Sequence, residues 1–208
     1  MIETIDNAFQ LIVGGICVLL AAGKVAASRK REWTFLLLYY CSYFLGNLYW
    51  LLYLLFYQRT PQYFYVADLS WWAGYLFLIL LLREAETGIG RKKQLLPWLG
   101  PAFTAGMCIF FVQRGEYVSN MIYAVLMGIL LWHAIRGMLP ISGSEKKQSK
   151  NTMLCAVTLF FFAMEYAEWT ASCFWMGDTL KNPYFWFDTL LTVSFPLFLP
   201  AVRKAAEE

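Results

Sequence analysis

Seven stretches of this sequence are apolar enough and long enough to cross a lipid bilayer, and they limit the fold more than any other feature. They cover residues 6–26, 34–57, 64–83, 95–113, 117–138, 152–176 and 184–203. A membrane-spanning helix needs about 20 mostly apolar residues. Hydrophobic residues make up 60% of the 208-residue chain and charged residues only 15%, more apolar surface than a soluble domain of this size could bury. We therefore expect an all-α polytopic membrane protein, with seven transmembrane helices in a single domain over residues 1–208.

The basic residues are divided unequally between the two sets of connections. Of the seventeen, Arg59, Arg114 and Lys181 lie on one side, and the other fourteen follow the first, third, fifth or seventh segment. Because cytoplasmic loops carry the excess of Lys and Arg, this pattern predicts an outside N-terminus and a cytoplasmic C-terminus in the plasma (inner) membrane. The acidic start MIETIDN lacks the basic region of a cleaved signal peptide, so the first segment is expected to be retained.

Three spacings in the first three segments recur in the last three. Asp68 to Arg83 and Asp188 to Arg203 each span fifteen residues, Asn7 to Gly15 and Asn120 to Gly128 each span eight, and Asn47 falls near Glu168 if one gap is allowed. These matches predict a parallel internal repeat, with repeat A over about 6–83, a linker helix over about 95–113 and repeat B over about 117–203. The alternative is a set of unrelated helices whose anchor residues coincide.

A plan of three helices, one linker helix and three further helices resembles the SWEET and PQ-loop sugar transporters and the PnuC vitamin transporters. The resemblance lies in the helix plan and covers most of the chain. At the level of motifs the chain departs from both groups. The PnuC transporters carry a WxxWxxY run, and the nearest text in this chain is Tyr166-Ala-Glu-Trp169. The Pro-Gln pair of this chain, Pro61-Gln62, lies in an outer connection between helices and does not make a convincing PQ-loop pair. The resemblance implies transport of a small solute through a bundle of seven helices.

Carboxylates inside apolar segments are the main candidates for function, because ionisable groups in the membrane are costly, by about 2.5–3.5 kcal/mol at mid-helix. Glu165 lies near the middle of its segment, Glu168 one turn away, and Asp68 and Asp188 near the outer ends of theirs. No basic residue occupies the outer halves of the segments, so Glu165 is expected to carry a proton at neutral pH. Asp68 and Asp188 would also fit the simpler role of capping helix starts.

Aromatic and polar residues share helix faces with these acids at spacings of three, four and seven. The candidate ligand-binding residues are Glu165, Glu168, Asp68, Asp188, Asn47, Trp50, Trp72 and Trp169. Carboxylates among Trp and Tyr faces suit an organic cation and also suit a titratable proton-coupling site. The aromatic residues near the outer interface would also fit an ordinary aromatic belt.

Three functions follow in order of preference. The first is a transporter of a small, cationic or aromatic solute through a cavity open to the outside. The second is a seven-helix sensor or receptor that signals to a separate cytoplasmic partner. The third is an intramembrane lipid-modifying enzyme that uses Glu165 and Glu168 as acid and base, although no GxSxG motif supports it. Because the transporter is preferred, we do not expect the protein to be an enzyme.

Single features of the sequence argue against metals, cofactors and nucleic acids as partners. The five cysteines form no CxxC pair and His133 is the sole histidine, so neither a metal site nor another cofactor is expected. The basic loops are short and are interpreted as topology determinants, so no nucleic acid is expected. The expected partners are the lipid bilayer and a small-molecule ligand, with a homo-oligomer or a cytoplasmic signalling partner as open alternatives.

Overall fold

The computed structural model describes residues 2–59, 61, 66–86, 94–115, 117–139 and 145–206. These residues form seven α-helices and one short 3₁₀ turn, and no strand occurs among them. The helices are α1 (Ile2–Ser28), α2 (Arg31–Tyr57), α3 (Val66–Ala85), α4 (Leu99–Val112, after the turn η1, Leu96–Trp98), α5 (Tyr117–Met138), α6 (Glu145–Ser172) and α7 (Pro183–Ala206). The prediction of an all-α chain with seven helices is confirmed.

Five of the helices, α1, α2, α3, α5 and α7, are long and apolar enough to cross a membrane. The apolar helical stretch Leu96–Val112, which includes α4, is shorter than these. Helix α6, whose second half carries Glu165 and Glu168, is not among the five apolar helices found in the described part of the chain. The structure therefore fits a membrane protein, while crossings by α4 and α6 stay predictions.

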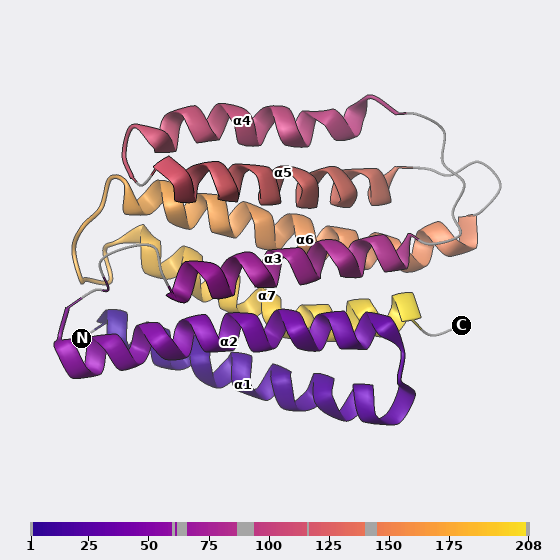
Figure 1. Ribbon diagram of the computed structural model, residues 1–208, viewed down its shortest axis with the longest axis horizontal. Helices are drawn as coiled ribbons and strands as arrows, with labels where there is room; N and C mark the ends of the chain where they lie inside the picture. Colours follow the sequence, from indigo (N-terminus) through magenta and orange to yellow (C-terminus); the bar gives the residue numbers. More distant parts are fainter. Residues whose placement is uncertain are drawn as a thin grey trace.

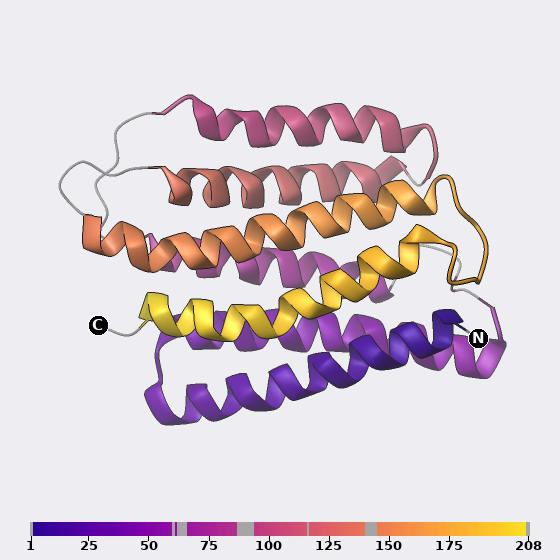
Figure 2. The ribbon, with the colours of Figure 1, turned by 180° about the vertical axis from the view of Figure 1, so that it is seen from behind.

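Six of the helices form a closed ring in the order α1, α2, α3, α5, α6, α7 and back to α1. Helices α2 and α7 also touch across the ring, as do α3 and α6. Helix α4 lies outside the ring against α5 (Figure 1). The N-terminal end of α1 and the C-terminal ends of α2, α4 and α6 lie at one end of the bundle, and the C-terminal end of α7 lies at the other (Figures 1 and 2).

Two glycines allow α2 and α3 to approach closely. A Cβ atom on Gly74 would lie 2.9 Å from a ring carbon of Tyr43, and one on Gly46 would lie 2.8 Å from the indole nitrogen of Trp71. Small residues at helix contacts are the usual means of close packing in membrane proteins. Here they also set the positions of two aromatic side chains that line the cavity described below.

The bundle is apolar on its outer faces and carries polar groups inside. Ile12 and Leu19 on α1 are 62% and 75% exposed, whereas Asp6 and Gln10 of the same helix are buried. Water would disfavour such an exposed apolar surface, and lipid would not. The arrangement therefore fits a bilayer around the ring.

The predicted C-terminal end of the sixth helix is wrong. Residues 152–176 were expected to form a single helix, but α6 ends at Ser172. The Trp175 amide closes the last turn by donating to the Ala171 carbonyl at 3.0 Å. The chain then turns toward α7, so Trp175 and Met176 belong to a connection at the cavity mouth instead of a helix.

Candidate ligand-binding site

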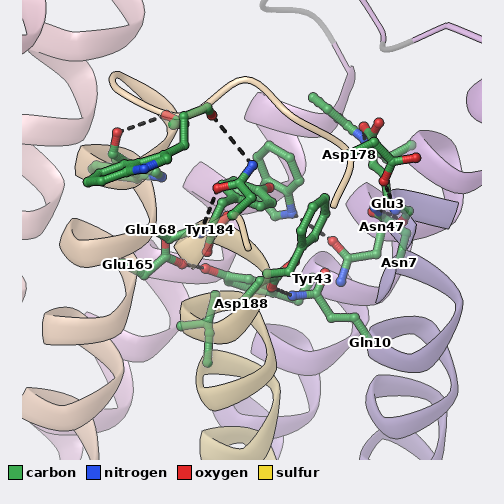
Figure 3. A pocket seen from close by; sticks show the side chains of 18 of the residues that line it. Glu3, Asn7, Gln10, Tyr43, Asn47, Glu165, Glu168, Asp178, Tyr184 and Asp188 are labelled. Carbon is green, nitrogen blue, oxygen red and sulfur yellow. Dashed lines mark hydrogen bonds between the residues drawn. The ribbon is translucent and has the colours of Figure 1, made fainter. Parts of the chain in front are cut away.

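A cavity of about 420 Å³ lies inside the ring at the end that carries the N-terminus. Its size is in the range of small-molecule sites, about 300–1,000 Å³. The polar and aromatic residues that line it come from α1, α2, α3, α5, α6 and α7 and from the α6–α7 connection. Figure 3 shows the labelled side chains converging on this space from several helices.

The innermost carboxylate is Glu165 on α6, which is 3% exposed. Its Oε1 accepts hydrogen bonds from the hydroxyls of Tyr43 and Tyr75, the latter at 2.9 Å. The two hydroxyls lie 3.1 Å from each other. Because Tyr43 belongs to α2, the contact with Glu165 joins two helices that face each other across the ring. Two donors on one oxygen hold this carboxyl group in a fixed orientation.

A second group of acids lies on the wall between α1, α6 and α7. The amide nitrogen of Gln10 donates to Oδ1 of Asp188 at 2.5 Å, and the carboxyl group of Asp6 lies within hydrogen-bonding reach of Asp188. Tyr184 lies within hydrogen-bonding reach of Glu168, whose Oε2 is buried with no protein partner. Glu168 therefore presents an unused acceptor beside the cavity.

The mouth is shaped by the connection between α6 and α7. Asn182 caps α7, because its Oδ1 accepts from the Tyr184 amide at 3.0 Å and Pro183 occupies the first helical position. Its Nδ2 donates to the Gly177 carbonyl at 2.9 Å and folds the connection back on itself. Asp178 in this connection accepts from the Glu3 backbone amide at 2.9 Å. The start of α1 is thus tied to the rim of the cavity.

Tryptophans cover much of the remaining wall. The rings of Trp50 and Trp71 lie 5.6 Å apart, and Trp71 Nε1 donates to Oδ1 of Asn47 at 3.2 Å. Trp169 packs against Tyr123 at 4.6 Å between ring centres. Aromatic faces attract cations through their quadrupoles, by about 0.5–2 kcal/mol. The wall therefore combines negative charge with π faces.

Five acidic residues line the cavity, namely Glu3, Glu165, Glu168, Asp178 and Asp188. None of the described lining residues is a lysine or an arginine. Glu165, Glu168 and Asp188 are also buried, and buried carboxylates without a positive partner are costly. A cationic ligand would offset that cost, and an anionic ligand would increase it.

Below the acids the cavity is closed by a packed aromatic layer. Tyr39, Phe161, Phe195 and Phe198 are each at most 1% exposed. The ring of Tyr39 lies 5.4 to 6.2 Å from the other three, mostly edge to face. The cavity is therefore open at one end of the bundle and blocked toward the other.

The structure brings together six of the eight residues expected from the sequence. Glu165, Glu168, Asp188, Asn47, Trp50 and Trp169 line the cavity. Asp68 and Trp72 do not belong to its lining. Asp68 accepts from the Tyr123 hydroxyl at 2.8 Å, and Trp72 packs against the same tyrosine at 5.9 Å. On α3, Trp71 takes the place at the cavity that was expected for Trp72.

Several lining residues were missed, above all those on α1. Glu3, Asn7 and Gln10 follow one another at spacings of four and three, which places them on one face of α1. That polar stripe in the first apolar segment was a usable signal. Asp178 and Tyr184 carried no comparable signal, because they reach the cavity only through the fold of the α6–α7 connection.

The two aspartates of the repeated spacing each accept a hydrogen bond from a neighbouring helix of the ring. Asp188 on α7 bonds to Gln10 on α1, and Asp68 on α3 bonds to Tyr123 on α5. Gln10 lies three residues after Asn7, and Tyr123 lies three residues after Asn120, which are the two asparagines that the sequence comparison aligned.

Comparison of the chain with models of known protein families, with curated proteins and with solved structures gave no match.

Proposed function

We propose that this chain is a seven-span membrane transporter that takes up a small cationic solute in the acidic, aromatic cavity. The observation that carries the proposal is the lining itself: five carboxylates and several tryptophans, with no lysine or arginine among the described lining residues. Such a site attracts cations by charge and by cation–π contact.

The ring order supports a parallel repeat of α1–α3 and α5–α7. Exchanging the two triplets turns the α1–α7 contact into the α5–α3 contact, and the α2–α7 contact into the α6–α3 contact. The Gln10–Asp188 and Tyr123–Asp68 hydrogen bonds exchange in the same way. Two similar halves around a central site are common in transporters, where one half moves against the other.

The position of the basic residues supports an outside N-terminus. Lys24, Arg29, Lys30 and Arg31 lie at or near the α1–α2 connection, which is at the end opposite the cavity. Under the positive-inside rule the cavity then opens to the outside. In a background without the five native cysteines, a membrane-impermeant thiol reagent applied to whole cells should label Lys181→Cys and should miss Ser28→Cys. The reverse labelling would overturn this orientation.

Uptake by the purified protein in liposomes tests the function. We expect saturable uptake of a small organic cation, inhibited by other organic cations and unaffected by anions of similar size. Glu168→Gln should reduce uptake per folded molecule, because it removes a charge at the cavity wall. Glu32→Gln, at the start of α2 and the other end of the bundle, is the matched control and should leave uptake unchanged.

A receptor is the second candidate, and the aromatic layer below Glu165 favours it. A cavity closed toward the cytoplasmic end can bind a solute without passing it on. A receptor should bind the same cations with the same dependence on Glu168 but give no uptake above protein-free liposomes. Binding without uptake would therefore replace the transporter by a receptor, and absence of both would remove the cation site.

A further inference from the structure

We propose that the ligand of this cavity is a linear diammonium compound, a diamine or polyamine, held by one ammonium group at each end of the cavity. The inference rests on the proposed cation site and specifies its ligand. It comes from the way the acids are divided between two levels of a cavity that tryptophans also line.

The inner ammonium site lies at Glu168 and Asp188. Glu168 lines the cavity and is 9% exposed, and its Oε2 is buried without a hydrogen-bond partner among the described residues. Asp188 is 3% exposed and receives only a neutral amide donor from Gln10 and a carboxyl group from Asp6. An ammonium group has three donors. It would supply the missing donor to Glu168 and the missing positive charge beside Asp188.

The outer ammonium site lies at Glu3, in the first turn of α1. Glu3 and Gln10 are seven residues apart on α1, which is about 10 Å along a helix. Trp50 Nε1 donates to Oε1 of Glu3 at 3.4 Å, and the Trp50 ring continues into that of Trp71. A carboxylate beside two indole faces suits a second ammonium group, because charge and cation–π attraction act at the same place.

The space between the two levels suits methylene groups better than further polar groups. Trp50, Trp71 and Trp169 line the cavity, and their rings offer apolar contact to methylene groups. A monovalent cation at either end would leave the carboxylates of the other end uncompensated. A metal ion fits less well, because no three His, Cys, Asp or Glu side chains of the described residues are grouped to hold one.

Isothermal titration of the full-length protein in detergent, with amines that differ in charge and in length, tests this inference. The probes are butylamine, putrescine and spermidine, with the uncharged butanediol as the control. We expect spermidine, whose terminal ammonium groups can reach both ends of the cavity, to bind roughly tenfold more tightly than butylamine, and the shorter putrescine to gain less. Butanediol should not bind.

Two matched Glu-to-Gln variants test which acid binds each ammonium group of the ligand. Glu3→Gln should lower spermidine affinity about tenfold and leave butylamine affinity unchanged, because it removes only the outer charge. Glu168→Gln should lower the affinity for both amines. Glu32→Gln, remote from the cavity, should change neither. Spermidine should also raise the thermal unfolding midpoint of the wild type more than that of Glu3→Gln.

The outcomes separate this inference from the proposed function. Equal affinities for butylamine and spermidine would overturn the diammonium ligand and leave a site for monovalent cations. Loss of butylamine binding in Glu3→Gln would also overturn it, since the two ends would then not be separate. If no amine binds, and uptake of other organic cations is also absent, the proposed function fails together with it.

Discussion

The two hydrogen bonds that join the halves of the ring resemble each other in register and differ in surroundings. Asp188 and Gln10 are both buried, at 3% and 6% exposed, and both line the cavity. Asp68 is half-buried and lies outside the lining, although its partner Tyr123 contributes to the wall. The cavity is therefore lined by both partners of one hydrogen bond and only by the tyrosine of the other.

The surroundings of the two aspartates differ as well. Asp188 has a second acid, Asp6, within hydrogen-bonding reach, and the cavity also contains Glu168. At the other joint, Asp68 is satisfied by a tyrosine that Trp72 covers. The added acids, more than the aspartate itself, distinguish the two joints. Four experiments test this comparison.

The largest expected effect is on ligand binding at Asp188. Asp188→Asn should weaken the binding of an organic cation roughly ten- to hundredfold, because a buried charge–charge contact is lost. Asp68→Asn, the counterpart, should change binding less than about twofold. Titration calorimetry on both variants measures the ratio. Equal losses would mean that both joints belong to the site and that the asymmetry described above is wrong.

The next effect concerns the place where α2 and α6 meet, at Tyr43 and Glu165. Glu165→Gln should keep the fold and remove the pH dependence of binding or uptake, because the amide cannot exchange a proton. Glu165→Ala should cost more stability, about 1–3 kcal/mol, since it leaves two tyrosine hydroxyls without their acceptor. The measurement is activity per folded molecule against pH. Superimposable curves for wild type and Glu165→Gln would exclude proton coupling at this residue.

A smaller effect, on the stability of the fold, is expected when the helix packing beneath the site is changed. Gly74 on α3 and Ser194 on α7 follow Asp68 and Asp188 by six residues each, so they are counterparts. Gly74→Ala places a methyl group against the ring of Tyr43 and should destabilise the fold by about 1–3 kcal/mol. Ser194→Ala removes only a hydroxyl that bonds to the Leu191 carbonyl within the same helix and should cost less than about 1 kcal/mol. Thermal unfolding in one detergent compares them.

The smallest effect is expected at the joint outside the cavity. Tyr123→Phe keeps the ring but removes the hydroxyl that donates to Asp68, and it should destabilise the fold by about 1 kcal/mol. Gln10→Leu at the other joint should act mainly on cation binding, because it leaves Asp188 without its amide donor. Unfolding and binding should be measured for both variants. The comparison fails if Tyr123→Phe affects binding more than Gln10→Leu does.

Much of the fold could be predicted because the apolar segments are long and well separated. Glu165 and Glu168 could also be found, since carboxylates stand out in an apolar segment. The pair Trp71 and Trp72 could not be resolved, because neighbouring residues differ by 100° around a helix and both fell within the polar stripe of α3. Spacing placed the tryptophan face only to within one residue.

The contacts of α1 lay beyond what the sequence pattern could provide. Gln10 and Asp188 are 178 residues apart, and no local periodicity connects them. The acidic start of the chain was interpreted for topology, so Glu3 and Asp6 were not considered as part of a site. The rim formed by Asp178 depends on the Asn182 cap and the fold of the α6–α7 connection, which spacing along helices does not describe.

The contact between α1 and α7 also has a consequence for biogenesis. Helix α1 enters the membrane early in synthesis and brings Asp6, Asn7 and Gln10 with it, whereas the Asp188 partner of Gln10 is made only with α7. Until then the polar face of α1 needs water, a translocon wall or an assembly factor, because lipid offers it no hydrogen bonds. The ring can close only after α7 is inserted, so truncation before α7 should leave α1 a substrate for membrane quality control.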